Sequence, residues 1–413
     1  MKIGVCSDEH VGRAIPREIG DLRRQAYRSA FSQAIDIFIK EKIGVMVSAG
    51  DLFERRTMTA EDTAFVRSEL QRLVDALGQV DIFFIRGNHD SSYANNALHF
   101  IQHPLAKYVH VLDDEGYSSD EVSVFGVSYD PYISTKFQRL KTPIKKFFTD
   151  NDTPIKILIT HTFIDGYTSL PPNLPRHYYL TINDFAGAGN NIVLNGHVHS
   201  SPGSKKFDKI LFLTPGATEP EDLGEEGPYG VYTIENFDAK FIPIIPFTPI
   251  LNVEVKAPGA AGEQYDWFVS EVEKEVTGCM KGASKPSIVR VKVEGVVSGE
   301  PGDLTSLLYE KISDMKDKDK NLVYVALVNK TSSVVKNVVF SPTGIAVNRD
   351  NYLEAVFEGL SEAARKDALI LANDVDTALD QQKSQQTGIL TSGDRKPFVK
   401  RWQTLFEEGV KTK

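Results

Sequence analysis

The sequence predicts an α/β sandwich followed by a smaller α+β domain and a helical tail. Three observations predict this order. Short apolar runs alternate with amphipathic helical patterns near the N-terminus, prolines at 243, 246 and 249 interrupt the pattern, and apolar residues after 351 recur at spacings of three and four. A chain of 413 residues is long for one domain and suits two or three.

The N-terminal part begins as strand, helix, strand, helix, strand. Apolar runs predict strands at residues 2–7, 44–49 and 81–86. Between them, residues 19–41 and 60–78 carry apolar side chains on one helical face. Further strands are predicted at 107–112, 121–127, 155–160, 191–195, 209–213, 229–234 and 239–245. This alternation is typical of an α/β sandwich.

A second domain follows the prolines. Its predicted strands cover 251–256, 287–296 and 321–329, and its predicted helices cover 263–278 and 303–316. After a polar connector come a long helical pattern at 351–381, a Gln/Ser/Gly-rich gap at 382–394 and a short helix at 397–408. We therefore divide the chain into a main domain (1–247), a small α+β domain (248–332), a linker (333–350) and a helical region (351–413).

Composition narrows the class of protein. No apolar run approaches the roughly 20 residues of a membrane span, and the first residues lack the features of a signal peptide. Cys6 and Cys279 are the only cysteines, and Cys6 lies inside an apolar strand, where we expect it to be core. We expect a cytoplasmic protein without a membrane anchor. The net charge of −9 argues against indiscriminate nucleic-acid binding, although local basic patches can still contact DNA.

Five predicted strands end in residues that bind metals. The strand ends carry Asp8 and His10, then Asp51, then Asn88 and His89, then His161, then His197 and His199. In an extended segment, residues two apart point the same way, so Asp8 and His10 could face one ion. Each motif alone is weak and is more often a turn or a surface accident. The ordered set of carboxylate, amide and imidazole groups instead indicates a pair of divalent ions.

The order of these motifs across residues 1–215 resembles the calcineurin-like metallophosphoesterases. The resemblance implies a sandwich of two mixed sheets flanked by helices. It also implies that one ion is held by Asp8, His10, Asp51 and His199, and the other by Asp51, Asn88, His161 and His197. Asp51 would bridge the two ions. His89 would be the catalytic histidine, placed over the substrate rather than bound to metal.

Within that superfamily the whole chain is similar to the Mre-eleven/SbcD nuclease family. The similar stretches are MKIGVCSDEHVGR, AGDLFE, RGNHDSSYANNALHFI and LPRHYYLTINDF, which comes shortly before NGHVH. The resemblance implies a manganese-dependent DNA nuclease that acts at double-strand breaks, associated with the nucleoid if the source is prokaryotic. It implies that residues 248–332 are a capping domain and that 351–413 bind a Rad-fifty/SbcC-type ABC ATPase. It also implies a homodimer through 60–78 and 95–102.

One position departs from that family. The residue after Asp-Leu-Phe is commonly a histidine linked with exonuclease action, whereas here it is Glu54, which cannot donate a proton to phosphate as an imidazolium can. The balance of endo- and 3'-5' exonuclease action is therefore left open. Two other functions share the same core: a nucleotide or small-molecule phosphodiesterase, and a non-catalytic scaffold for the ATPase. The capping domain and tail argue against the first, and the complete ligand set argues against the second.

DNA contact is expected from basic residues. Five arginines lie beside the metal motifs: Arg13, Arg17, Arg55, Arg56 and Arg86. A second basic group lies on or near one predicted helix: Lys136, Arg139, Lys141, Lys145 and Lys146. The arginines adjoining the motifs are the stronger candidates for phosphate contact.

Overall fold

The structure, a computed structural model, describes residues 1–90, 97–225, 227–259, 262–333, 339–340, 346–347, 365–366 and 368. The predicted helices at 351–381 and 397–408 therefore lie outside the described residues, apart from 365, 366 and 368. No helix of the described part is long and apolar enough to cross a bilayer.

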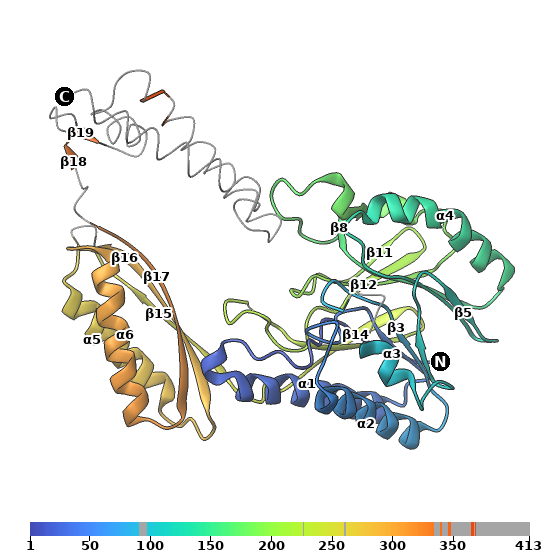
Figure 1. The fold of residues 1–413 in the computed structure, drawn as a ribbon, viewed down its shortest axis with the longest axis horizontal. Coiled ribbons are helices and arrows are strands. Elements are labelled where there is room, and N and C mark those ends of the chain that lie inside the picture. Colours follow the sequence, from blue (N-terminus) through green and yellow to red (C-terminus); the bar gives the residue numbers. More distant parts are fainter. Residues whose placement is uncertain are drawn as a thin grey trace. The chain divides into compact units, whose positions relative to one another are not determined.

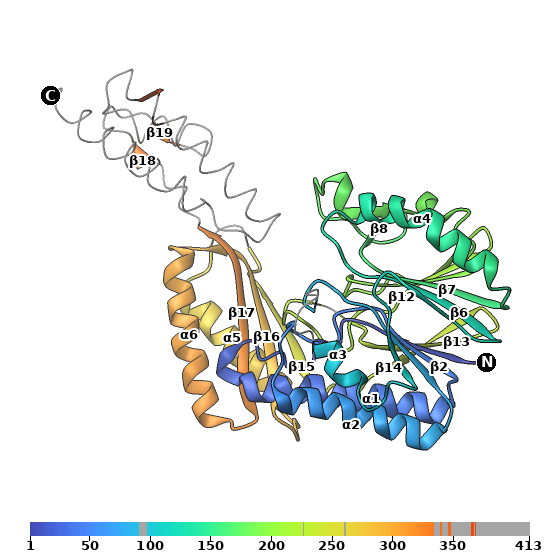
Figure 2. The ribbon, with the colours of Figure 1, turned by 45° about the vertical axis from the view of Figure 1, so that its right-hand side comes forward.

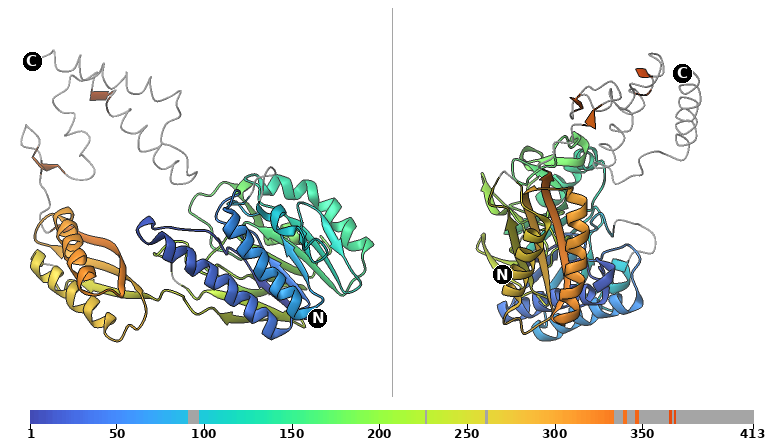
Figure 3. Two further views of the ribbon diagram at one scale, coloured as in Figure 1. Left: turned by 60° about the horizontal axis from the view of Figure 1, so that its bottom comes forward. Right: turned by 90° about the vertical axis from the view of Figure 1, so that its left-hand side faces the viewer.

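The first sheet has six strands in the order β14-β13-β1-β2-β3-β4. Their bounds are β1 Ile3–Cys6, β2 Val45–Ser48, β3 Asp81–Phe84, β4 Val109–Val111, β13 Gly230–Glu235 and β14 Asp238–Pro243. Strands β1 to β4 are parallel, and β13 runs antiparallel to β1. Helices α1 (Gly20–Glu41), α2 (Ala60–Leu77) and α3 (Ala97–Gln102) cover its outer face (Figures 1 and 3).

The second sheet also has six strands, in the order β11-β12-β10-β7-β6-β5. Their bounds are β5 Gly116–Ser118, β6 Val122–Val127, β7 Ile155–His161, β10 Ile192–Gly196, β11 Gly203–Phe207 and β12 Ile210–Thr214. Helix α4 (Ile133–Asp150) covers the outer face with a buried stripe that includes Phe137, Ile144 and Phe148. A short pair, β8 (Phe163–Asp165) and β9 (Tyr179–Thr181), lies beside it.

The two sheets pack face to face around an apolar core. Val5, Val47 and Phe83 from the first sheet join Ile157 and Leu194 from the second in one buried cluster. Figure 2 shows the resulting layers, with α1 and α2 on one side of the two sheets and α4 on the other. Each sheet is buried on both faces, against the other sheet on the inside and under helices on the outside, which explains why its central strands are apolar throughout rather than alternating. The predicted sandwich of two mixed sheets flanked by helices is confirmed.

The main predicted elements agree with the structure to within a few residues, whereas several short strands were not predicted. Strand β11 has the sequence GSKKF and its middle residues are exposed. Strand β5 has the sequence GYS and lies at the other edge of the same sheet. Edge strands need no apolar face, so they leave no periodic signal in the sequence.

After Pro249 the chain forms a three-stranded sheet in the order β15-β16-β17. The bounds are β15 Ile250–Lys256, β16 Ser287–Val297 and β17 Leu322–Ser333. Helices α5 (Tyr265–Met280) and α6 (Pro301–Lys318) run along one face of this sheet (Figure 1). A two-stranded pair, β18 (Val339–Phe340) and β19 (Ala346–Val347), follows.

Candidate metal centre

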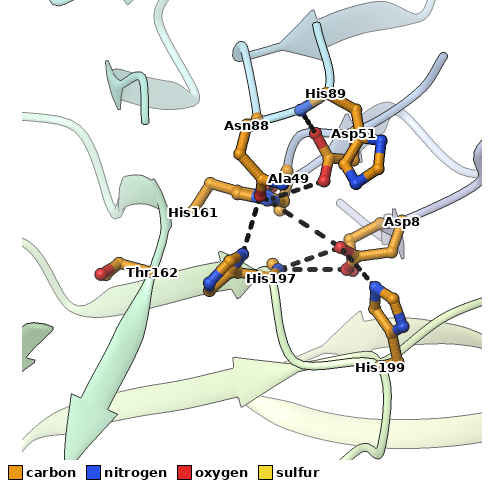
Figure 4. Close-up of polar contacts among 12 residues, drawn as sticks. Asp8, Ala49, Asp51, Asn88, His89, His161, Thr162, His197 and His199 are labelled. Carbon is orange, nitrogen blue, oxygen red and sulfur yellow. Dashed lines mark hydrogen bonds and ion pairs between the residues drawn. The ribbon is translucent and has the colours of Figure 1, made fainter. Parts of the chain in front are cut away.

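The candidate residues meet where the carboxyl ends of five strands come together. Strands β1, β2 and β3 are adjacent and parallel in the first sheet, and β7 and β10 are adjacent and parallel in the second. Parallel neighbours end at the same edge of a sheet, so the residues that follow them gather there. Figure 4 shows the side chains of Asp8, Asp51, Asn88, His161, His197 and His199 pointing toward one another.

Four of these residues have a left-handed backbone. The φ angles are 53° at Asp8, 42° at His10, 57° at Asp51 and 81° at His197. This conformation is uncommon for residues other than glycine, and strained backbone of this kind clusters at functional sites. Asp8 and His10 do bring ligand atoms to one point, as expected, but the extended backbone from which this was expected is wrong. The chain turns sharply at both residues instead.

One group of ligand atoms comes from Asp8, His10 and His199, whose atoms lie within 4.8 Å of one another. The Nε2 atom of His199 is 3.8 Å from Asp8 Oδ1. Its other nitrogen, Nδ1, is 2.8 Å from a carboxylate oxygen of Glu225. Both nitrogens of His10 are buried without a hydrogen-bond partner, although Nδ1 lies 3.3 Å from Glu54 Oε2.

A second group joins Asp51, Asn88, His161 and His197. The Nδ1 atom of His161 donates a hydrogen bond of 2.8 Å to the carbonyl of Ala49, which directs Nε2 into the site. That Nε2 lies 3.2 Å from Asp51 Oδ2 and 3.1 Å from Asn88 Oδ1. The Nδ1 atom of His197 lies 2.8 Å from the same Asn88 oxygen.

His89 belongs to neither of these groups, although its ligand atoms lie within 4.8 Å of those of His10 and Glu54. Its backbone N–H donates to Asp51 Oδ1 at 2.8 Å, and its Nδ1 lies 3.0 Å from the carbonyl of Glu54. A carbonyl can only accept, so Nδ1 carries the proton and Nε2 is available to a substrate. The side chain is 26% exposed, whereas those of His10 and His161 are fully buried. A histidine that reaches solvent beside a buried cluster suits contact with a substrate.

Glycines allow the strand ends to approach this closely. Gly50 has a φ of 99°, and a Cβ there would overlap the imidazole of His161. A Cβ on Gly87 would overlap the carboxylate of Asp51. Each glycine therefore admits a candidate ligand from another segment into the space that a side chain would fill.

The chemistry of the cluster fits divalent cations. Asp8 and Asp51 are fully or almost fully buried, and in the described part of the chain no lysine or arginine forms an ion pair with either. Two neighbouring carboxylates that are both buried need a positive partner. Other atoms here are also suited to a metal ion. The Nε2 of His10 is buried without a hydrogen-bond partner, and two imidazoles face Asn88 Oδ1. Divalent metal ions bind nitrogen and oxygen donors together.

In the absence of cations, several residues of the cluster have pKa values far from their ordinary ones. Although burial alone lowers the pKa of His161, the adjacent Asp51 raises it to about 9. Burial and the charge of His161 lower the pKa of His197 to about 3. Burial and the charge of Asp51 raise the pKa of Asp90 to about 8. Without cations, protons must occupy this cluster in place of metal.

Three acidic neighbours of the cluster were not predicted as such from the sequence: Glu221 and Glu225 were missed, and Glu54 was considered only as a departure from a family pattern. Glu221 and Glu225 both lie next to His199, at 3.2 and 2.8 Å from its Nδ1. The acidic stretch 219–225 was the available signal, but nothing in the sequence connects it to a histidine. Glu54 is brought to Arg13 because the segments after β1 and β2 continue to pair, through Val11 and Phe53.

A cavity of about 350 Å³ opens beside the cluster. It is lined by Phe163, His197, Val198, His199, Ser200, Glu225 and Tyr229. Two of the candidate ligands thus form part of its wall. The cavity thus borders both groups of candidate ligands, through His199 and His197, on a side that also carries Phe163 and Tyr229.

This chain is similar to known phosphoesterases and to DNA repair proteins. Residues 1–201 match the family described as calcineurin-like phosphoesterase. The DNA double-strand break repair protein Mre11 of Sulfurisphaera tokodaii is 24% identical over 357 residues, which cover 81% of this chain and 86% of that protein. Mre11 of Sulfolobus acidocaldarius is 23% identical over 310 residues, covering 72% and 76%.

Among solved structures, one described as a novel archaeal phosphodiesterase aligns with 59% of this chain and 100% of its own, at 14% identity and a TM-score of 0.33. The family match and the Mre11 relatives confirm the resemblance that the sequence motifs indicate.

Proposed function

We propose that this chain is a metal-dependent phosphoesterase and, more specifically, a DNA nuclease that hydrolyses phosphodiester bonds at double-strand breaks. Its residues 1–201 match the calcineurin-like phosphoesterases, and the chain is similar to Mre11 proteins. The observation that supports this most strongly is the convergence of seven candidate ligands from five strand ends around two buried carboxylates, with which no lysine or arginine of the described residues forms an ion pair. The similarity to Mre11 proteins over 81% of the chain favours DNA as the substrate over a small diester.

Two ions are proposed, divided as the family resemblance implies. The first would be held by Asp8, His10, Asp51 and His199, and the second by Asp51, Asn88, His161 and His197. Two groups of neighbouring ligand atoms lie here, Asp8 with His10 and His199, and Asp8 with Asp51 and His161. They support two adjacent positions, with Asp8 as well as Asp51 lying between them. Manganese is the proposed metal, because a set so rich in imidazole suits it better than magnesium.

Two divalent ions, when bound, clamp a phosphate and stabilise in-line displacement. The protein's own residues supply the rest. The carboxylate of Asp51 is held by the backbone N–H of His89, so the two are fixed relative to one another. The Nε2 of His89 is the proposed proton donor to the leaving oxygen. It would donate from the imidazolium form, because the Nδ1 proton is held by the carbonyl of Glu54.

The residues proposed to contact DNA are revised by their burial. Arg13 is 9% exposed and pairs with Glu54, and Arg86 is 1% exposed and pairs with Asp113, so both are structural. Arg17, Arg55 and Arg56 are exposed and remain the candidates beside the site. Lys136 is also buried, bonding the carbonyl of Ser128 and pairing with Asp114. The exposed basic residues on α4 are Arg139, Lys145 and Lys146.

Two protein partners belong to the proposal. A homodimer would form through α2 and the segment 95–102, of which 97–102 are described. Phe100 is 58% exposed there, whereas Leu98 and Ile101 are buried in the monomer core, so Phe100 rather than either of those is the contact that supports the proposal. A Rad-fifty/SbcC-type ABC ATPase would bind 351–413, most of which lies outside the described residues.

A nuclease assay tests the proposed function. The purified chain should cleave a linear DNA duplex with free ends in the presence of Mn²⁺, and should lose that activity in a chelator. A nucleotide diester serves as the competing substrate, and a covalently closed DNA circle shows whether ends are needed. Cleavage of the diester alone would favour a small-molecule phosphodiesterase, and no hydrolysis of either would favour a scaffold.

A further inference from the structure

The two proposed metal positions differ in what holds their histidines from behind. In the first group, the Nδ1 atoms of both histidines face carboxylates. His10 Nδ1 lies 3.3 Å from Glu54 Oε2, and His199 Nδ1 lies 2.8 Å from Glu225 Oε1. Each histidine thereby turns its Nε2 toward the site, as the 3.8 Å approach of His199 Nε2 to Asp8 indicates.

The second group has neutral support. The Nδ1 of His161 donates to the backbone carbonyl of Ala49 at 2.8 Å. Within the described ranges, no ion pair joins His197 to a carboxylate, and its Nδ1 points into the site, 2.8 Å from the amide oxygen of Asn88, which is itself a proposed ligand. The negative charges behind the imidazoles therefore lie on one side of the centre only.

The supporting carboxylates are themselves held in place. Arg13 joins Glu54 to Glu221, whose Oε2 also lies 3.2 Å from His199 Nδ1. The Nη1 atom of Arg13 is 2.8 Å from Glu54 Oε1 and 2.9 Å from Glu221 Oε1. Glu225 uses its second oxygen to accept a hydrogen bond of 2.8 Å from the backbone N–H of Glu221. The side chains of Arg13 and Glu54 are each 10% exposed, so solvent weakens this network little.

We propose that Glu54 and Glu225 are positioning residues that make the first metal position the tighter of the two. The inference rests on the ligand assignment of the proposed function. A carboxylate behind a ligating histidine fixes the orientation of the ring and raises the basicity of the nitrogen that faces the metal. The first ion therefore binds before the second, and the second sets the metal concentration at which the centre is complete.

Glu54 has a second effect through the same atoms. Its Oε2 lies 3.7 Å from the Nδ1 of His89, and the rings of His10 and His89 meet edge to face at 4.6 Å between centroids. One side chain thus contacts both a proposed ligand and the proposed catalytic histidine. Arg13 pairs with Oε1 of the Glu54 carboxylate, while Oε2 faces the two histidines. The positive charge of Arg13 reduces the repulsion between this carboxylate and a phosphate.

Calorimetric titration of the full chain with MnCl₂ tests the inference. The unsubstituted chain should show two binding events of different affinity, and Asn88→Ala should remove only the weaker one. Glu54→Gln and Glu225→Gln should each weaken the tighter event by about 10–100-fold and leave the weaker event within about twofold. The control is Glu69→Gln, because Glu69 is also largely buried and paired with an arginine, Arg72, but belongs to neither ligand group.

Thermal unfolding without metal keeps the result interpretable. Variants that unfold at the same temperature as the unsubstituted chain show that an altered affinity is not a folding defect, and Glu54→Asp, which keeps the charge, should recover part of the affinity. Equal weakening of both events, no weakening, or complete loss of binding in a folded Glu54→Gln variant would overturn the inference. Failure of the unsubstituted chain to bind Mn²⁺ would instead overturn the proposed function.

Discussion

The backbone N–H of His89 donates a hydrogen bond of 2.8 Å to the carboxylate of Asp51. The loop that carries the proposed catalytic histidine is thus joined to the proposed bridging ligand through main-chain atoms. Substitution of the His89 side chain leaves that hydrogen bond in place, whereas substitution of Asp51 by a residue without a carboxylate removes it. This asymmetry separates the roles of the two residues experimentally.

We predict that His89→Asn retains both ions and loses cleavage. The backbone donor to Asp51 remains, but no imidazole is left to protonate the leaving oxygen. The loss of a general acid typically costs about 10²–10⁴-fold in rate. Calorimetry with MnCl₂ beside a DNA cleavage assay measures both quantities. A variant that no longer binds Mn²⁺ would show that His89 is a ligand.

Asp51→Ala should have the opposite effect and remove both ions. Asp51 lies 3.2 Å from His161 and is the only proposed ligand shared by the two positions. The control is Asp81→Asn, since Asp81 begins β3 at the other end of the strand, away from the ligands. Elemental analysis after dialysis gives the metal content. An Asp51→Ala protein that keeps one full equivalent of manganese would contradict the bridging role.

Most of the centre could be predicted from sequence because its residues stand directly after apolar strands. The end of a parallel strand fixes where the next residue lies within its own sheet. Strands β1 and β2 therefore bring Asp8 and Asp51 together, and β7 and β10 bring His161 and His197 together. The extended geometry expected at Asp8 and His10 was wrong, because both adopt left-handed backbone that no sequence pattern signals. Glu225 could not be found at all, since its contact with His199 spans a loop and depends on how β12 and β13 return to the site.

In the fold, too, some features could be predicted from the sequence and others could not. Helices α1 and α2 carry complete apolar stripes and were predicted to within a few residues. Arg13 and Arg86 were expected to contact DNA because they lie beside the metal motifs, and Lys136 because it belongs to a basic group, but each is buried with an acidic partner. A charged residue is buried when it forms an ion pair with a residue far away in the sequence, and such a pair cannot be predicted from composition.

Manganese affinity should rise with pH. The pKa of His161 is raised to about 9, because Asp51 outweighs the effect of burial, and that of His199 is raised to about 9, because its bond to Glu225 outweighs burial. At neutral pH both imidazoles hold a proton in the metal-free protein, and metal binding displaces it. Affinity should therefore increase from pH 6 toward pH 9 and level off above it.

The stability of the metal-free protein should follow the reverse trend. A raised folded-state pKa stabilises the fold below the ordinary histidine pKa of about 6.5, and that contribution is lost as the pH rises through about 9. Calorimetry in buffers of different ionisation enthalpy counts the released protons, and melting curves follow the stability. An affinity that does not change between pH 6 and 9 would contradict this account.

Phe100→Glu should convert the proposed homodimer to a monomer. Phe100 is 58% exposed on α3, and a buried charge at a dimer contact is costly. Light scattering measures the mass, and Ile245→Glu, at a 71% exposed apolar residue elsewhere, is the control. Leu98 and Ile101 are unsuitable because their substitution would disrupt the core. An unchanged dimer mass in Phe100→Glu would rule out this surface.

Deletion of residues 347–413 should leave metal binding and simple nuclease activity intact. The ligand residues all lie between Asp8 and His199, in strands whose pairing does not involve the deleted segment. Co-purification with a Rad-fifty/SbcC-type ATPase should be lost. A truncated protein that still binds the ATPase at full affinity would show that the docking surface lies elsewhere.

The most direct test of the two-metal centre is anomalous scattering from crystals grown with MnCl₂. The account predicts two manganese peaks on either side of the Asp51 carboxylate, about 3.5–4 Å apart. One peak should be bounded by Asp8, His10 and His199, and the other by Asn88, His161 and His197. A single peak, or a peak held by Glu221 and Glu225 outside these groups, would contradict it.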